Sequence, residues 1–385
     1  MKNFTFYNPT KIIFGKGTIG ALKNEIPAGK KIMLVYGGGS IKKNGTYDEI
    51  MKALEGRQVE EFSGVEPNPT YETLMKCVEK VKATGCDFLL AAGGGSVIDG
   101  TKFIAAAALF EGDPWEILQT FGSCVKKALP FASVLTLPAT GSEMNSGSVI
   151  TRAKFKAKLP FKSDLVYPVF SVLDPMKTYT LPAKQVANGV VDAFVHIVEQ
   201  YLTQPAHAAV QDRFAEGLLH VLIEQGPLAL KEPENYEIRA NLMFTATMAL
   251  NGLIGCGVPQ DWSTHMIGHE LTALYGLDHA VTLAIVLPGN LTLRKQLKHE
   301  KLLQYAQRVW EIKSGNDEHK ISEAIKKTAE FFESLGVKTK LSDYKLGEEA
   351  IEKVVAQLKS HQMIKLGENG DVSLEVSRQI LELCL

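Results

Sequence analysis

The feature that most constrains the fold is a pattern that recurs three times in the first half of the chain. Each time, a short apolar run stops at a turn rich in glycine or threonine. The three runs and their turns are residues 31–36 before Gly37-Gly38-Gly39-Ser40, residues 87–92 before Gly93-Gly94-Gly95-Ser96, and residues 131–137 before Pro138-Ala139-Thr140-Gly141-Ser142. Continuous apolar runs of this length are typical of strands that are buried on both faces of a parallel sheet.

Helical patterns lie between these runs, as over residues 71–84 and 99–109. Strand, turn and helix in repeated order predict an open α/β sheet that is mostly parallel. Ligands of such sheets bind at the carboxyl ends of the strands, where all three turns fall. Residues 149–152 and 165–174 are expected to be further strands, on either side of a basic stretch with Lys158 near its middle.

The pattern changes after residue 182, because helical periods replace the apolar runs. The expected helices cover residues 185–201, 208–223, 237–253, 263–274 and 319–335. With 385 residues, the chain is long enough for two sizeable domains. We predict an α/β dinucleotide-binding domain over residues 1–182 and an all-helical domain over residues 183–385.

Charge and composition exclude several classes of protein. The 42 Lys and Arg residues balance 43 Asp and Glu residues. The chain therefore has no excess of positive charge that would attract nucleic acid or an anionic membrane. No uncharged stretch is long enough to span a bilayer and no apolar signal segment opens the chain, which predicts a cytoplasmic protein. The five cysteines lack CxxC spacing and are expected to be reduced thiols.

The glycine turns are candidate phosphate sites. Three successive glycines let backbone N–H groups approach a phosphate, and a following helix adds the positive end of its dipole. In the turn of residues 93–96, Ser96 is expected to cap that helix and Asp99 to lie in its first turn. The turn is neither GxGxxG nor a P-loop.

The first turn, Gly37, Gly38, Gly39 and Ser40, predicts which dinucleotide is preferred. It presents no carboxylate to the ribose hydroxyls, as an NAD site would. It presents a hydroxyl, backbone donors and the neighbouring Lys42 and Lys43, which suit a 2′-phosphate. We therefore expect NADP(H) to be preferred over NAD(H).

Histidines in the second half form a candidate metal site. All nine histidines lie there. Asp192 and His196, and likewise His265 and His269, are spaced i,i+4 and therefore share a helix face, and His279 follows a short turn. Imidazoles with one carboxylate suit a divalent ion such as Zn²⁺ or Fe²⁺. The residue after His265 is not Glu, so the HExxH pattern of metalloproteases is absent.

These motifs together resemble the iron-containing, or group III metal-dependent, alcohol dehydrogenases, over essentially the whole chain. Within that family the chain looks most like the bacterial NADPH-dependent butanol dehydrogenase and broad-range aldehyde reductase branch. The motifs that carry the resemblance are residues 10–17, 36–40, 66–69, 93–102, 113–115, 137–143 and 257–262, Asp192 with His196, and residues 265–279.

The resemblance implies a fold similar to dehydroquinate synthase, an NADP(H) cofactor and a homodimer. It implies that the metal ligands are Asp192, His196, His265 and His279, whereas His269 lies near the nicotinamide. It implies that the cofactor-binding residues, beyond the first turn, are Gly94, Gly95, Ser96, Asp99, Thr136, Thr140, Ser142, Val149 and Lys158. Many NAD-using relatives carry Asp where this chain has Gly38, which supports the NADP(H) prediction.

The expected function is hydride transfer between NADP(H) and a primary alcohol or aldehyde, with a divalent metal as Lewis acid and His269 and Asp99 as catalytic candidates. Alternatives remain: a polyol or phospho-alcohol dehydrogenase, a synthase of the dehydroquinate type, and an NADP(H)-binding sensor without turnover. The sequence does not choose between iron and zinc, because the same ligands hold either ion.

Overall fold

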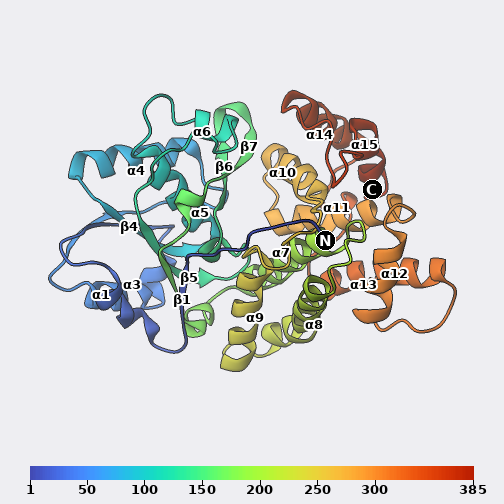
Figure 1. Cartoon of the computed structure of the whole chain (residues 1–385), viewed down its shortest axis with the longest axis horizontal. Helices are drawn as coiled ribbons and strands as arrows, with labels where there is room; N and C mark the ends of the chain where they lie inside the picture. The colour runs from blue at the N-terminus through green and yellow to red at the C-terminus, as the bar shows by residue number, and fades with distance from the viewer. The chain divides into compact units, whose positions relative to one another are not determined.

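The computed structural model describes residues 1–385, which form two compact units. The α/β unit consists of Tyr7–Leu181 and Pro233–Thr247, and the helical unit of Met1–Phe6, Pro182–Glu232 and Met248–Leu385. Figure 1 colours the α/β unit mainly blue to green and the helical unit mainly yellow-green to red. The predicted fold class, an α/β domain followed by a helical domain, is confirmed.

A six-stranded sheet forms the centre of the α/β unit. All of its strand pairs are parallel, and the spatial order is β1-β8-β5-β4-β2-β3. The strands are β1 (Lys11–Phe14), β2 (Lys31–Tyr36), β3 (Gln58–Phe62), β4 (Phe88–Gly94), β5 (Phe131–Leu137) and β8 (Phe170–Leu173). The three predicted apolar runs are β2, β4 and β5. The sequence analysis missed β1 and β3, which are the edge strands and lack a continuous apolar run.

The apolar runs are continuous because both faces of the sheet are covered. Met33 and Val35 belong to the cluster that includes side chains of α4 (Tyr71–Thr84) and α5 (Gly95–Ala107). The alternate residues Ile32 and Leu34 belong to a second cluster, formed with α1 (Leu22–Glu25), α3 (Thr46–Ala53) and the η1 turn (Thr18–Ala21). Successive side chains of a strand point to opposite faces, so both sets must be apolar.

The two further expected strands are present, the second only in part. Residues 149–152 lie within β6 (Gly147–Arg152), which pairs antiparallel with β7 (Ala157–Lys162). The basic stretch thus includes a strand. Of residues 165–174, only Phe170–Leu173 is a strand, because Asp164–Val166 forms a 3-10 turn.

The long helices of the second half are α7 (Ala183–Tyr201), α8 (Ala209–Lys231), α9 (Tyr236–Ala249), α10 (Ser263–Tyr275), α11 (His279–Leu293), α12 (His299–Arg308), α13 (Asp317–Ser334), α14 (Glu348–Ser360) and α15 (Leu374–Glu382). Within the helical unit, α7 packs against α8 and α11, and α10 packs against α11 (Figure 1). The helix predicted over 208–223 continues to Lys231 through Pro227, and the one predicted over 237–253 ends at Ala249.

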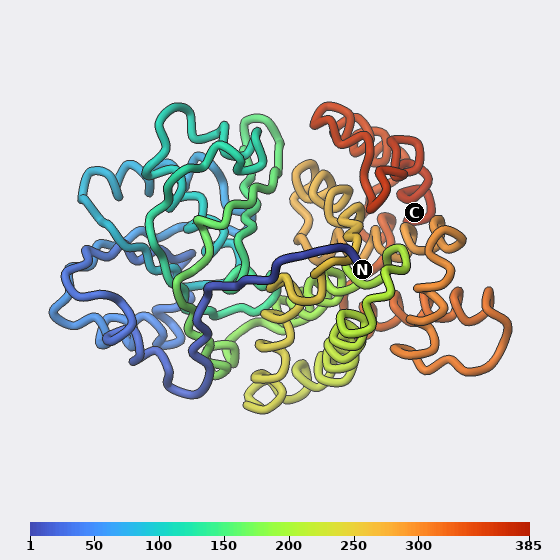
Figure 2. Tube along the Cα trace, viewed as in Figure 1, coloured from blue at the N-terminus to red at the C-terminus, as the bar shows by residue number.

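The grouping into units does not follow one cut in the chain. It places most of α9 in the α/β unit and the first six residues in the helical unit. There, the Lys2 N–H donates to the Gly257 carbonyl (2.8 Å), at the dark-blue N-terminal end of the trace in Figure 2. The single domain boundary after residue 182 stays a prediction.

Two composition-based expectations can be compared with the structure. None of the helices combines the length and the apolar character needed to cross a membrane. All five cysteines are free, as predicted, with Cys77, Cys86 and Cys384 buried.

Close packing explains the glycines between β4 and α5. A Cβ added to Gly94 would lie 2.9 Å from Leu137 Cβ, and one added to Gly95 would lie 2.6 Å from Thr140 Cγ2. The helix begins at Gly95 with Gly94 as its N-cap, and no side chain caps it. The expected Ser96 cap is therefore wrong, and Asp99 lies beyond the first turn of α5.

Gly95→Ala should destabilise the α/β unit by roughly 1–3 kcal/mol, because the Thr140 side chain or the turn must shift. Gly38→Ala is the matched control: its added Cβ meets nothing within 4 Å, and it should change stability by less than about 0.5 kcal/mol. Thermal unfolding of the two variants without cofactor measures the difference. Equal melting temperatures would contradict the packing argument.

Candidate functional site

The buried helix α7 supplies a carboxylate and an imidazole to the helical unit. Asp192 is 4% exposed and His196 is 5% exposed, and the i,i+4 spacing puts both on one face. The His196 Nδ1 lies 3.5 Å from the Asp192 Oδ1. Every residue from Gly189 to Tyr201 is buried, so these polar groups are held inside the unit rather than at its surface.

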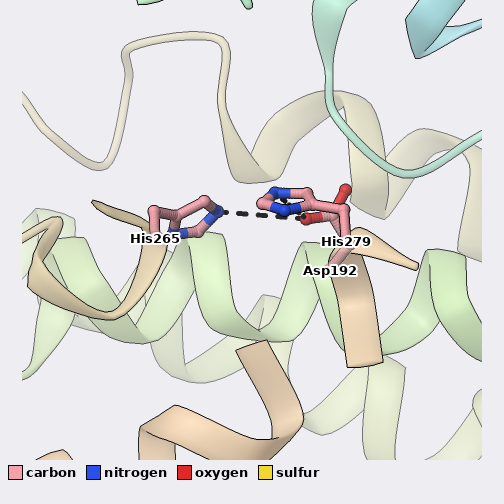
Figure 3. Close-up of side chains that lie close together, drawn as sticks. All are labelled: Asp192, His265 and His279. Atoms are coloured by element: carbon pink, nitrogen blue, oxygen red, sulfur yellow. Dashed lines mark ion pairs between the residues drawn. The ribbon is translucent and has the colours of Figure 1, made fainter. Parts of the chain in front are cut away.

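Two further helices bring imidazoles to the same carboxylate. His265, in α10, places its Nε2 3.9 Å from Asp192 Oδ1, and His279, the first residue of α11, places its Nε2 3.7 Å from that oxygen. One ligand atom from each of Asp192, His265 and His279 lies within 4.8 Å of the other two. Figure 3 shows the two imidazole rings directed toward the carboxylate.

His196 lies beside this group but is outside its 4.8 Å limit. Its ring stacks on His265, with centroids 4.5 Å apart and planes 30° apart. Burial lowers the pKa of His196 to about 4, so its imidazole is neutral near pH 7. The buried Nδ1 of His196 has no hydrogen-bond partner. A neutral, unsatisfied imidazole beside a carboxylate and two more imidazoles fits a divalent cation.

His269 lies one helical turn after His265. Its ring centroid is 5.0 Å from that of His279 and 6.3 Å from that of His265. It is 3% exposed and is not one of the three grouped ligands. The structure thus separates His269 from His265, which the spacing alone could not do.

In the α/β unit, the glycine turns lie at one edge of the sheet. β2 and β4 are parallel neighbours, and so are β4 and β5, so Gly37, Gly94 and Thr140 all lie at or shortly after carboxyl ends of strands on that side of the sheet. β2 also pairs with β3 on its other side, which makes the gap between β2 and β4 the point where the strand order reverses. Such points bind dinucleotides in open α/β sheets.

Several predicted cofactor residues form one hydrogen-bonded cluster. Ser142 Oγ donates to Asp99 Oδ1 (2.5 Å), and the Val149 N–H donates to Asp99 Oδ2 (2.9 Å). The Ser142 N–H donates to Thr140 Oγ1 (3.2 Å). Desolvation raises the pKa of Asp99 against the opposing effect of Lys102. Thr136 lies on β5, and Lys158 on β7 donates to Asn68 Oδ1 (2.9 Å).

Lys102 is a residue of this cluster that the sequence analysis did not single out. Its side chain is fully buried, and its ammonium donates to Ser142 Oγ (2.8 Å), Asn145 Oδ1 (2.8 Å) and the Gly147 carbonyl (2.7 Å). It therefore ties the 142–147 segment to α5. The signal that could have found it is the i,i+3 spacing from Asp99 on an otherwise apolar helix.

The first glycine turn has a carboxylate nearby that the sequence analysis did not place. Glu61, on β3, accepts hydrogen bonds from Tyr36 Oη (2.8 Å) and Tyr47 Oη (2.6 Å). Lys42 Nζ lies 3.8 Å from Glu61 Oε2 and 4.5 Å from the centre of the Tyr47 ring. The exposed Gly38 itself presents only backbone.

Comparison with known proteins identifies the family. Residues 9–175 match the family described as iron-containing alcohol dehydrogenase, and residues 186–375 match the C-terminal part of the Fe-containing alcohol dehydrogenase family. The chain belongs to the iron-containing alcohol dehydrogenase family.

Individual relatives match over nearly the whole chain. It is 59% identical over 384 residues to the NADPH-dependent aldehyde reductase YqhD of Escherichia coli (strain K12), with 99% of each chain covered. The crystal structure of E. coli K-12 YqhD superimposes with a TM-score of 0.99 at 58% identity, covering 100% of this chain and 99% of that one. The probable NADH-dependent butanol dehydrogenase 1 of Bacillus subtilis (strain 168) is 45% identical over 359 residues, covering 92% of each.

The predicted family and the predicted enzyme class, a metal-binding alcohol/aldehyde oxidoreductase, are confirmed. Asp192, His265 and His279 form the metal-binding group. The roles of His196, His269 and each cofactor residue remain predictions.

Lys102→Met should change how stability depends on pH. Burial lowers the pKa of Lys102 from 10.5 to about 8. Between these values the unfolded chain binds more protons at Lys102 than the folded chain, so this residue makes stability rise with pH. From pH 8 to 10.5, the free energy of unfolding of the wild type, measured by urea denaturation, should rise relative to that of Lys102→Met by roughly 1–3 kcal/mol. A constant difference would show that Lys102 does not titrate in this range.

Proposed function

We propose that this chain is an NADPH-dependent aldehyde reductase, able to oxidise primary alcohols in the reverse direction, with one divalent metal ion, iron or zinc. The observation that carries the proposal is the convergence of Asp192, His265 and His279. It occurs in a chain 59% identical over its length to an NADPH-dependent aldehyde reductase.

Different residues of the chain would bind the metal ion and transfer the proton. The ion would be held by Asp192 and by the imidazoles of His196, His265 and His279. When bound, the ion supplies a Lewis acid for the substrate oxygen, and the nicotinamide supplies or accepts the hydride. His269, whose ring lies 5.0 Å from that of His279, is the candidate relay for the proton of the substrate oxygen.

The glycine turns would hold the dinucleotide. Gly94 is the N-cap of a 13-residue helix that begins with Gly95 and Ser96. The first N–H groups of a helix have no partner within it, which suits a pyrophosphate. The residues proposed to line the rest of the cofactor are Asp99, Thr136, Thr140, Ser142, Val149 and Lys158. The 2′-phosphate would be bound by the first glycine turn, Gly37, Gly38, Gly39 and Ser40, with Lys42 nearby.

The family resemblance also supports a homodimer that acts on a small alcohol or aldehyde. The balanced charge and the lack of a signal segment support a cytoplasmic protein without a nucleic acid or membrane partner.

The function is tested by following NADPH absorbance at 340 nm with butanal, after elemental analysis of protein purified without chelator. His265→Ala should lose bound metal and turnover together, because it removes one of the three grouped ligands. The exposed His319→Ala is the control and should keep both. Full turnover by a metal-free His265→Ala enzyme would overturn the Lewis-acid role, and no turnover with any aldehyde would favour an NADP(H)-binding sensor.

Gly38→Asp should shift the cofactor preference toward NADH. The Gly38 Cβ position is open and its φ is not positive, so the turn accepts a side chain. A carboxylate there would repel a 2′-phosphate and could accept from ribose hydroxyls. The ratio of kcat/KM for NADPH to that for NADH should fall by at least about tenfold. Gly38→Ala adds a Cβ without charge and controls for sterics, and an equal fall in both variants would contradict the proposal.

A further inference from the structure

A third polar residue shares the metal-binding face of α7. Glu199 follows Asp192 by seven residues and His196 by three, which is the spacing of one helix face. Glu199 is 2% exposed. A carboxylate buried this deeply needs partners for both of its oxygens.

Each oxygen of Glu199 has a partner on α10. The Oε1 accepts a hydrogen bond from the Thr264 N–H (2.7 Å), and the Oε2 forms a short hydrogen bond with the His265 Nδ1. Both partners lie in the first turn of α10, where no side chain of the N-cap residue Trp262 caps the helix. Glu199 therefore caps α10 from another helix while it holds the His265 ring.

The contact constrains which nitrogen of His265 can bind a metal. When Nδ1 carries the proton and donates it to Glu199, the lone pair is on Nε2, the nitrogen that lies 3.9 Å from Asp192 Oδ1. Partners of this kind orient a ligating imidazole and select its tautomer.

The surroundings hold Glu199 in place. The Asp261 N–H donates to the Glu199 carbonyl (2.9 Å), and Asp261 Oδ1 accepts from the Ser263 N–H (3.1 Å) at the same end of α10. The cations nearby are paired elsewhere: Lys298 Nζ lies 2.8 Å from Asp261 Oδ2 and 2.8 Å from Glu368 Oε1. The Glu199 carboxylate is thus hydrogen-bonded to the His265 imidazole and to the N-terminus of α10.

We propose that Glu199 is a positioning residue of the metal centre: it fixes the ring and the tautomer of His265 and thereby sets how tightly Asp192, His265 and His279 bind a divalent ion. This inference rests on the proposed metal-dependent function. A residue that only capped α10 would affect stability and would leave metal affinity unchanged.

Glu199→Gln separates the two roles, because the two donors meet different carboxylate oxygens and the amide offers only one oxygen. If the amide oxygen caps α10, the amide NH₂ group faces His265 Nδ1 and favours the tautomer with the proton on Nε2. The Nε2 nitrogen then has no lone pair with which to bind a metal. Metal-stripped protein should then bind Zn²⁺, measured by competition with a chromophoric chelator, about 10- to 100-fold more weakly than the wild type.

The matched control is Glu216→Gln in α8. Glu216 is also a buried carboxylate of the helical unit, but it accepts from Tyr201 Oη (2.9 Å) and the Gln304 side chain (3.0 Å). It should keep wild-type Zn²⁺ affinity even if its melting temperature falls. Equal Zn²⁺ affinity in wild type and in folded Glu199→Ala, which removes both acceptor oxygens, would overturn the proposal.

A second measurement needs no substitution of Glu199. The ¹⁵N chemical shifts of histidine-labelled, metal-stripped wild type should show the Nδ1–H tautomer of His265. The His265 signals are assigned by their loss in His265→Ala. Observation of the Nε2–H tautomer would overturn the proposal. Failure of the metal centre itself gives a different result, since wild type and His265→Ala would then bind Zn²⁺ equally weakly.

Discussion

The helical unit is organised around a polar stripe buried inside an apolar helix. Asp192, His196 and Glu199 lie along one face of α7, and each is at most 5% exposed. Burying such groups is unfavourable unless other elements supply partners. The helices α10 and α11 supply these partners. His265 lies between the Asp192 and Glu199 carboxylates, and His279, at the start of α11, lies beside Asp192. The constraint that stabilises the unit is thus the one that builds the metal centre.

The α/β unit relies on a different constraint, the close approach of backbone to side chains after β4. The glycines there are required by contacts with Leu137 and Thr140, irrespective of any ligand. The same absence of Cβ atoms leaves backbone N–H groups accessible at the start of α5. Lys102 then joins α5 to the segment carrying Ser142. The structural role and the proposed cofactor-binding role therefore fall on the same few residues.

Local patterns predicted much of the fold. The apolar runs identified β2, β4 and β5 because these strands are buried on both faces, and i,i+4 spacing paired Asp192 with His196 correctly. The edge strands β1 and β3 were missed because none of their residues is fully buried, so they need no continuous apolar run. The Ser96 cap was wrong because tight packing of glycines, and not a side-chain cap, begins α5. Glu199 could have been found from its place on the polar stripe of α7.

The sequence by itself determined the order of strands and helices, the positions of the glycine turns and the ligand types available on each helix. These properties depend on side-chain chemistry within one or two turns of chain. Spacing along the chain did not separate His265 and His279 from His269, and their grouping with Asp192 depends on the tertiary structure. Only the tertiary structure showed that Glu199 holds the other side of His265 and that Glu61 lies beside Lys42. These contacts join residues far apart in sequence, and they depend on how the apolar faces of separate elements pack together.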